Sequence, residues 1–361
     1  MSLRRVLLIR LGALGDTILA SSAAGLLRRH QPDVEIDLLV SSGLERLCVM
    51  VPEVSEAYGV PLRKLPPAWN PGLRRTLLRL NRKGYDLAYL METSPRFLPL
   101  LRSIRADEHL ALGQGAERDE PAEGVPAALR YQRLLWAEGI APDQVCYPRL
   151  APKEEAVQGA SRLLADLGLD PRRPLVGLHP GNSFRGRKKW RRWRQRADIR
   201  SWPETRWVEL VRGLVRLCPE AQLVLFGSAQ DRPVNGRVLK GVGRELPGCA
   251  IASSAGRTEN LALAAALLSR FSLFVATDTG PLHMAAALGV PLVGLYGPTR
   301  YRETGPFTDR AAAVTVRKSL PCQPCYGRAE QKICRLNRCM LEIRADEVLE
   351  KIVETRVLEP R

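Results

Sequence analysis

Four residues in the segment 277–298, TDTGPLHMAAALGVPLVGLYGP, have the types and spacing that a site for a phosphate and a sugar requires: Asp278, Thr279, Gly280 and His283. They lie between two apolar runs, which predict a strand, a polar turn and a helix. Backbone N–H groups at such a helix N-terminus bind phosphate. Asp278 can accept hydrogen bonds from hydroxyls, so the pattern favours a nucleotide-sugar. In the alternative interpretation, Asp278 or Thr279 merely caps the helix.

A second polar turn, RLGALGD, follows the first predicted strand and ends in Asp16. Gly12 and Gly15 allow a tight turn and close approach of a ligand. A carboxylate at a helix N-terminus stays ionised, and one that faces a cleft can accept a proton from an attacking hydroxyl. Asp16 is therefore a candidate general base, and a plain helix cap is the alternative. The turn is not G-x-G-x-x-G, which argues against a nicotinamide cofactor.

Two further predicted strands open into polar turns that contain glycine. The first turn is HPGNS, with Asn182 and Ser183, and the second is GSAQDR, with Gly227 and Asp231. A parallel sheet places the carboxyl ends of its strands on one edge, so a nucleotide could span these turns. We expect these four residues to contact the donor.

Length and composition predict two α/β domains. The chain has 361 residues, of which 45% are hydrophobic and 26% are charged. No apolar run approaches the roughly 20 residues that a membrane-spanning helix needs. The start, MSLRRVLLIR, has too short an apolar stretch for a secretory signal and is typical of a first strand. We expect a cytoplasmic protein.

Apolar runs alternate with helical patterns, which indicates parallel sheets with crossover helices. We expect an N-terminal domain at 1–165, a C-terminal domain at 170–343, and a last helix within 344–361 that packs back on the first domain. Strands are expected at 5–9, 36–40, 87–91, 109–112, 175–178, 222–226, 273–276 and 291–295. Helices are expected at 17–30, 73–82, 131–138, 153–167, 204–217 and 345–357.

The net charge of +17 predicts an anionic partner. Much of the positive charge lies at 185–200, where basic residues alternate with tryptophans. Such a stretch can lie on an anionic membrane or bind nucleic acid by charge and stacking. In the alternative it is only a solvated insertion.

Four cysteines have the spacing C-x2-C-x8-C-x4-C: Cys322, Cys325, Cys334 and Cys339. Their number matches a closed structural Zn²⁺ site, and reduced thiols beside a loop are the alternative. Eight cysteines in a cytoplasmic chain argue against a disulfide framework.

The chain resembles the ADP-heptose:lipopolysaccharide heptosyltransferases of glycosyltransferase family 9. The similarity lies in RRVLLIRLGALGDTILASSA at the start, LHPGNS, SWPETRW, FGSAQDR, DTGPLHMAAALGVPLVGLYGPT and the cysteine-rich segment. The resemblance implies the GT-B fold: two Rossmann-like domains with parallel sheets facing across a cleft. The donor would be held by the C-terminal domain and the acceptor by the N-terminal one. It also implies transfer with inversion, with no metal and no other cofactor.

The same resemblance implies roles for single residues. Asp16 would be the general base and Asp278 would bind sugar hydroxyls. The donor diphosphate would be bound by Thr279, Gly280, His283 and Ser183.

One position departs from the family. Members usually have lysine two residues before the Trp-Pro pair, and this chain has Arg200. Arg200 could replace that lysine, or Lys188 or Lys189 could reach the donor instead, and arginine and lysine are not equivalent there. For an acidic acceptor, the predicted contacts are Arg10, Arg63 and Lys64.

The leading hypothesis is a peripheral enzyme at the inner face of the cytoplasmic membrane. It would transfer a heptose from ADP-heptose to the inner core of a lipopolysaccharide precursor, an acidic lipid-linked saccharide. The alternatives are another nucleotide-sugar or acceptor, and a nucleic-acid-binding protein that uses residues 185–200.

Overall fold

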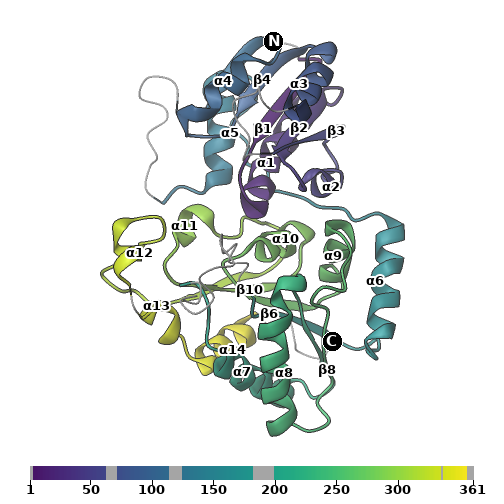
Figure 1. Cartoon of the computed structure of the whole chain (residues 1–361), viewed down its shortest axis with the longest axis vertical. Helices are drawn as coiled ribbons and strands as arrows, with labels where there is room; N and C mark the ends of the chain where they lie inside the picture. Colours follow the sequence, from purple (N-terminus) through teal and green to yellow (C-terminus); the bar gives the residue numbers. More distant parts are fainter. Residues whose placement is uncertain (1–2, 62–70, 114–123, 182–198, 335, 356–361) are drawn as a thin grey trace. The chain divides into compact units, whose positions relative to one another are not determined.

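The computed structural model describes residues 3–61, 71–113, 124–181, 199–334 and 336–355. The chain forms two compact units. The first comprises Met1–Ala151 with Arg302–Phe307, and the second comprises Pro152–Tyr301 with Thr308–Arg361. Figure 1 shows the elements of both units, and each unit has its own sheet.

The first unit is built on a parallel sheet with the strand order β3-β2-β1-β4-β5. The residues at the centre of β1, from Val6 to Ile9, are fully buried. A strand that is covered on both faces needs such a continuous apolar run. The strands are β1 (Arg5–Arg10), β2 (Glu35–Ser41), β3 (Glu56–Val60), β4 (Tyr85–Leu90) and β5 (Ala106–Ala111), and the helices are α1 (Leu14–His30), α2 (Glu45–Cys48), α3 (Pro71–Lys83), α4 (Leu98–Arg102) and α5 (Ala127–Ala137).

The second unit is built on a parallel sheet with the strand order β11-β10-β9-β6-β7-β8. Its strands are β6 (Leu175–His179), β7 (Gln222–Leu225), β8 (Ile251–Ser253), β9 (Leu273–Thr277), β10 (Leu292–Tyr296) and β11 (Ala313–Arg317). Its longer helices are α6 (Glu154–Asp166), α7 (Glu204–Leu217), α8 (Arg232–Glu245), α9 (Leu261–Leu268), α10 (Gly280–Leu288) and α14 (Ala345–Glu354). The shorter ones are α12 (Ala329–Ile333) and α13 (Arg338–Leu341). Helix α11 (Tyr301–Thr304) begins at the last residue before the insertion of Arg302–Phe307 into the first unit.

Both strand orders contain a topological switch point. The chain moves outward in one direction from β1 and then in the other from β4, and it does the same from β6 and β9. Ligands of open α/β sheets bind outside the carboxyl ends of the strands at such points. The fold therefore predicts ligand sites at the carboxyl ends of the β1/β4 pair and of the β6/β9 pair.

The predicted fold class, two Rossmann-like domains with parallel sheets, is confirmed, and so is each predicted strand and helix, with small shifts at the ends. The sequence analysis missed β3, β8 and β11. These strands lie at the edges of the sheets, and their residues are only partly buried. An edge strand lacks the continuous apolar run on which the prediction depended.

Two helices lie elsewhere than predicted. We expected α6 in the first domain and α14 against that domain, but both belong to the second unit. Helix α6 packs beside α9, and α14 lies beside α7 (Figure 1). The reason is apolar complementarity within the second unit: Val348 and Ile352 of α14 join its buried core.

Candidate active site

The first site lies at the β1/β4 switch point and joins Arg10 to two carboxylates. Arg10 is the last residue of β1, and its Nη1 lies 2.7 Å from Oε2 of Glu92, just after β4. The same Nη1 donates to the Met91 carbonyl at 2.7 Å, while Glu92 Oε1 accepts the Leu11 N–H at 2.8 Å. Arg10 Nη2 lies 3.4 Å from Asp16 Oδ1. We call Arg10, Asp16 and Glu92 the base cluster.

Asp16 occupies the first turn of α1, because this helix begins at Leu14 and not at Thr17 as predicted. Its Oδ2 accepts the Ala13 N–H at 3.0 Å, which fixes the carboxylate against the helix start. The Asp16 side chain is 36% exposed, compared with 11% for Glu92. Asp16 is therefore the acid of this pair that a substrate can reach.

The surroundings also change the ionisation of Glu92 and Arg10. Burial raises the pKa of Glu92, although the neighbouring Arg10 opposes the shift. Burial also disfavours the charge of Arg10, but Tyr131, Asp16 and Glu92 outweigh it and raise the Arg10 pKa. The enclosed guanidinium therefore remains charged and orients both acids.

The acceptor contact of Arg10 stays a prediction. Its side chain is only 14% exposed, and its terminal nitrogens face Glu92, Met91 and Asp16. Arg10 thus connects the two carboxylates of the base cluster.

The second site spans the β6/β9 switch point. Thr279 Oγ1 donates to the Thr277 carbonyl at 3.1 Å, so its lone pair is free to accept from His179 Nδ1, also 3.1 Å away. His179 ends β6, and Thr279 is the N-cap residue of α10. This bond ties together the two strand ends between which a ligand would bind.

The predicted donor residues after β9 lie together, and we call Asp278, Thr279, Gly280 and His283 the donor turn. Asp278 and His283 are 8% and 6% exposed, and Asp278 Oδ1 lies 3.8 Å from His283 Nε2. In the described part of the chain, His283 Nδ1 is buried and makes no hydrogen bond. A buried ring nitrogen of this kind calls for an explanation, and a bound ligand would provide one.

Arg200, a predicted donor contact, reaches the donor turn. Its Nη1 donates to the Asp278 carbonyl at 3.2 Å. Its guanidinium carbon lies 5.0 Å from the centre of the Tyr326 ring. Arg200 thus brings a cation to the N-terminus of α10, where the family usually has a lysine.

Residues 145–334 match the model of glycosyltransferase family 9 (heptosyltransferase), which covers more than half of the chain. The chain belongs to this family. It is a glycosyltransferase, as the motifs predicted.

Relatives of similar length support this assignment. The chain is 29% identical over 322 residues to lipopolysaccharide heptosyltransferase 2 of Salmonella typhimurium, covering 86% of this chain and 87% of the relative. It is 26% identical over 368 residues to lipooligosaccharide heptosyltransferase 2 of Haemophilus influenzae, covering 97% and 98%.

Solved structures share the fold. ADP-heptose lps heptosyltransferase II of E. coli superposes with a TM-score of 0.73 at 24% identity, covering 98% of each chain. A family 9 glycosyl transferase from Veillonella parvula superposes with a TM-score of 0.80 at 21% identity, covering 99% of this chain and 98% of the other.

Asp231, a predicted donor contact, is buried in this family 9 enzyme, and its contact with the donor stays a prediction. It is 3% exposed, and its Oδ2 accepts from the Ser228 N–H at 2.7 Å and the Ser228 hydroxyl at 2.8 Å. Burial opposes its ionisation, but His179 and Ser228 lower the Asp231 pKa below its ordinary value. A Cβ at Gly227 would lie 2.7 Å from that of Asp231, so this glycine leaves room for the carboxylate.

The sequence analysis missed Glu92 and Tyr296, and it named the HPGNS turn without selecting His179 as a site residue. Tyr296 ends β10, and burial together with the charge of Asp278 raises its pKa well above the ordinary value. The signal available for all three was a polar residue at or just after the end of an apolar strand.

Several predicted contacts lie outside the described residues. They are Arg63, Lys64, Asn182, Ser183, Lys188, Lys189 and the rest of the basic stretch up to residue 198. None of the described helices is long and apolar enough to cross a membrane.

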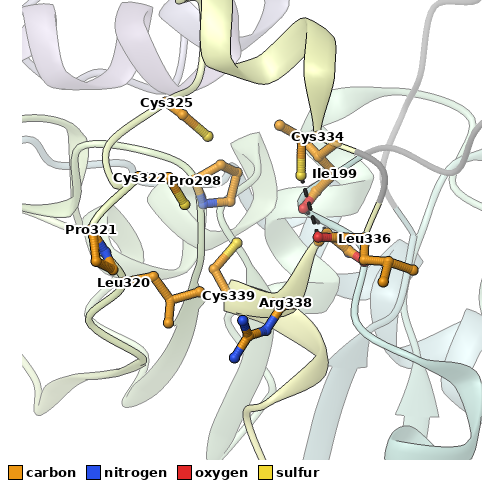
Figure 2. Close-up of a pocket in the computed structure, with 11 residues that line it drawn as sticks. Ile199, Pro298, Leu320, Pro321, Cys322, Cys325, Cys334, Leu336, Arg338 and Cys339 are labelled. Carbon is orange, nitrogen blue, oxygen red and sulfur yellow. Dashed lines mark hydrogen bonds between the residues drawn. The ribbon is translucent and has the colours of Figure 1, made fainter.

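The four clustered cysteines of the enzyme are free thiols and line one pocket of about 250 Å³ (Figure 2). In the part of the chain that the structure describes, no three histidine, cysteine or acidic side chains are already arranged to hold a metal ion. The predicted Zn²⁺ site is thus not assembled, although its four residues are gathered.

Proposed function

We propose that this chain transfers a heptose from ADP-heptose to the inner core of a lipopolysaccharide precursor, with inversion and without a catalytic metal or other cofactor. The observation that carries the proposal is the donor turn at the β6/β9 switch point, in a chain of family 9. The names of its relatives, lipopolysaccharide and lipooligosaccharide heptosyltransferases, support the acceptor class.

The donor turn can bind both ends of a nucleotide-sugar. Backbone N–H groups at the start of α10 suit a diphosphate, because the helix dipole favours negative charge there. The Asp278 carboxylate suits the hydroxyls of the sugar. We assign His283 and Arg200 to the charge that develops on the departing diphosphate, since preorganised donors at such a charge lower the barrier.

The base cluster supplies the other half of the reaction. An acceptor hydroxyl oxygen attacks the anomeric carbon, and the bond from that carbon to the phosphate oxygen breaks. The hydroxyl proton passes to Asp16, and ADP leaves with the electron pair of the broken bond. Attack opposite the leaving group inverts the anomeric carbon. Arg10 and Glu92 hold Asp16 in place for this step.

An acidic lipid-linked acceptor fits the charge of the chain. The exposed face of α3 carries Arg74, Arg75, Arg79 and Arg82 around Leu78, which is 61% exposed. A basic helical face with an apolar residue suits the surface of an anionic membrane. We therefore place the enzyme at the inner face of the cytoplasmic membrane, with Arg63 and Lys64 as further acceptor contacts.

A transfer assay tests the donor and the acceptor class together. The purified enzyme is incubated with a deacylated inner-core acceptor and with ADP-heptose, or with a UDP- or GDP-sugar, and products are identified by mass spectrometry. We expect a product carrying one added heptose with ADP-heptose only. Transfer from UDP- or GDP-sugars alone would contradict the donor assignment.

The reason to consider a nucleotide-sugar other than ADP-heptose is Arg200, which occupies the position where the family usually has lysine. Thermal unfolding in the presence of each nucleotide separates the two cases, because a ligand that binds the folded state raises the melting temperature. ADP should raise it, and UDP and GDP should not.

A further inference from the structure

Residues 318–341 follow β11 and have almost no core of their own, and we call them the cysteine segment. Among its described residues only Cys325, Cys339 and Met340 are buried, and the last two belong to the main core of the second unit. Helix α12 buries no residue, and Ile333 and Leu336 are 78% and 67% exposed. A stretch with so little buried apolar surface needs another source of stability, and small folds commonly use a metal or disulfides.

In place of a cluster of apolar side chains, the cysteine segment has four thiols that line one pocket. Figure 2 shows Cys322, Cys325, Cys334 and Cys339 around one pocket. In the structure the Cys334 thiol donates to the Leu336 carbonyl at 3.3 Å. Ile199, Pro298 and Leu320 close other sides of this pocket. Apart from Asn337 and Arg338, the other residues that line the pocket are apolar.

We propose that Cys322, Cys325, Cys334 and Cys339 bind one Zn²⁺ ion as a closed structural site. Four thiolates are a typical ligand set for structural zinc, and Cys-x2-Cys is a common half of it. On binding, each thiol loses its proton to solvent, and four S–Zn bonds form without any change of oxidation state. With Zn–S bonds of about 2.3 Å, the pocket must contract around the ion. The thinly packed α12 can follow this contraction.

Hydrogen bonds connect the cysteine segment to the surroundings of the donor turn. Cys325 N–H and Tyr326 N–H both donate to the Pro298 carbonyl at 3.0 Å. Asn337 Nδ2 donates to the Ser201 carbonyl at 2.9 Å, next to Arg200. The Tyr326 ring lies under the Arg200 guanidinium. Zinc at the four cysteines would therefore hold Tyr326, and through it Arg200, in position.

Metal content tests the proposal without reference to the transfer reaction. The enzyme is purified under reducing conditions, reconstituted with Zn²⁺, desalted and analysed by mass spectrometry for metals. We expect one zinc per chain. Replacement by Co²⁺ should give the intense near-ultraviolet band of thiolate coordination, together with visible bands of a tetrahedral ion. Protein that holds no zinc after reconstitution, or that shows disulfides in place of free thiols, would overturn the site.

Serine variants locate the ligands. Cys322→Ser and Cys334→Ser should each lower zinc content at least several-fold and abolish the cobalt thiolate band. The matched control is Cys218→Ser, a buried cysteine at the end of α7 and outside the cluster. If Cys322→Ser and Cys334→Ser retain zinc as the control does, the ligand assignment is wrong. Should a variant fail to fold, the wild-type metal content and cobalt spectrum still decide.

Discussion

At the scale of single residues, Arg10 pairs with two carboxylates that differ in exposure. Glu92 is the enclosed partner, with a side chain 11% exposed and only 2.7 Å from the Arg10 guanidinium. Asp16 is the more open partner at 3.4 Å, with a side chain 36% exposed. Charge compensation by Glu92 leaves the Asp16 carboxylate available to a substrate hydroxyl. Two acids at one strand edge thus acquire different roles from their surroundings.

Glu92→Gln should destabilise the enzyme and slow it. A buried guanidinium would lose its closest charged partner, which we expect to lower the free energy of unfolding by about 2–4 kcal/mol. Arg10 would then pair with Asp16 alone, so kcat should fall while KM for the donor stays unchanged. Denaturant unfolding and steady-state kinetics measure both effects. The control is Glu108→Gln, at an exposed residue of β5. Equal behaviour of the two variants would refute the positioning role of Glu92.

Asp231→Asn should reduce stability in a way that depends on pH. The folded-state pKa of Asp231 is lowered, so its carboxylate stabilises the fold above the unfolded-state pKa of about 3.9. That contribution is lost as the pH falls through the folded-state pKa. We expect a deficit of about 1–3 kcal/mol at neutral pH that shrinks below about pH 4. Urea unfolding across this pH range, with the exposed Asp107→Asn as control, provides the measurement. A deficit that does not change with pH would exclude the ionic role.

At the scale of elements, glycine sets how closely the strand-end turns pack. A Cβ at Gly181 would collide with the Asp231 carboxylate, whereas a Cβ at Gly236 in α8 meets nothing within 4 Å. Gly181→Ala should therefore lower the free energy of unfolding by about 1–3 kcal/mol and weaken ADP binding. Gly236→Ala should raise it by about 0.5–1 kcal/mol, because alanine is the better helix residue. Thermal unfolding and ADP titration measure both effects for the two variants. Similar changes in stability and in ADP affinity for Gly181→Ala and Gly236→Ala would contradict this account of the turn.

The elements that position the sites were predictable because their apolar signal is local and strong. The buried runs of β1, β6 and β9 predicted strands, and the polar residues after them predicted turns at one sheet edge. What could not be read from the sequence was which polar residue turns inward. Asp231 and Asp278 both follow apolar strands. Only the structure shows that the Asp231 carboxylate accepts hydrogen bonds from the N–H and the hydroxyl of Ser228. Likewise, Glu92 has no local motif, and only strand order brings it to Arg10.

At the scale of the whole molecule, positive charge should govern acceptor binding. The net charge is +17, and α3 exposes Arg74 and Arg75. Because salt screens such attraction, KM for an acidic acceptor should rise several-fold between about 0.05 and 0.3 M salt. The donor is held by local hydrogen bonds in the proposed site, so its KM should change less.

Charge reversal locates the effect. Arg74→Glu with Arg75→Glu should raise acceptor KM and flatten its salt dependence. Lys240→Glu with Arg244→Glu makes the same change of charge on the exposed face of α8 and should do neither. Equal effects of the two pairs would mean that net charge acts without any preference for α3.

Asp16 provides the most direct measurement of the central claim, which is that its carboxylate takes the proton of the acceptor hydroxyl during heptose transfer. Asp16→Asn keeps the size of the side chain and removes the base. Initial rates with ADP-heptose and an inner-core acceptor should fall by about 10²–10⁴-fold, while the dissociation constant for ADP, measured by calorimetry, stays at the wild-type value. A variant that transfers heptose at nearly the wild-type rate would contradict the account.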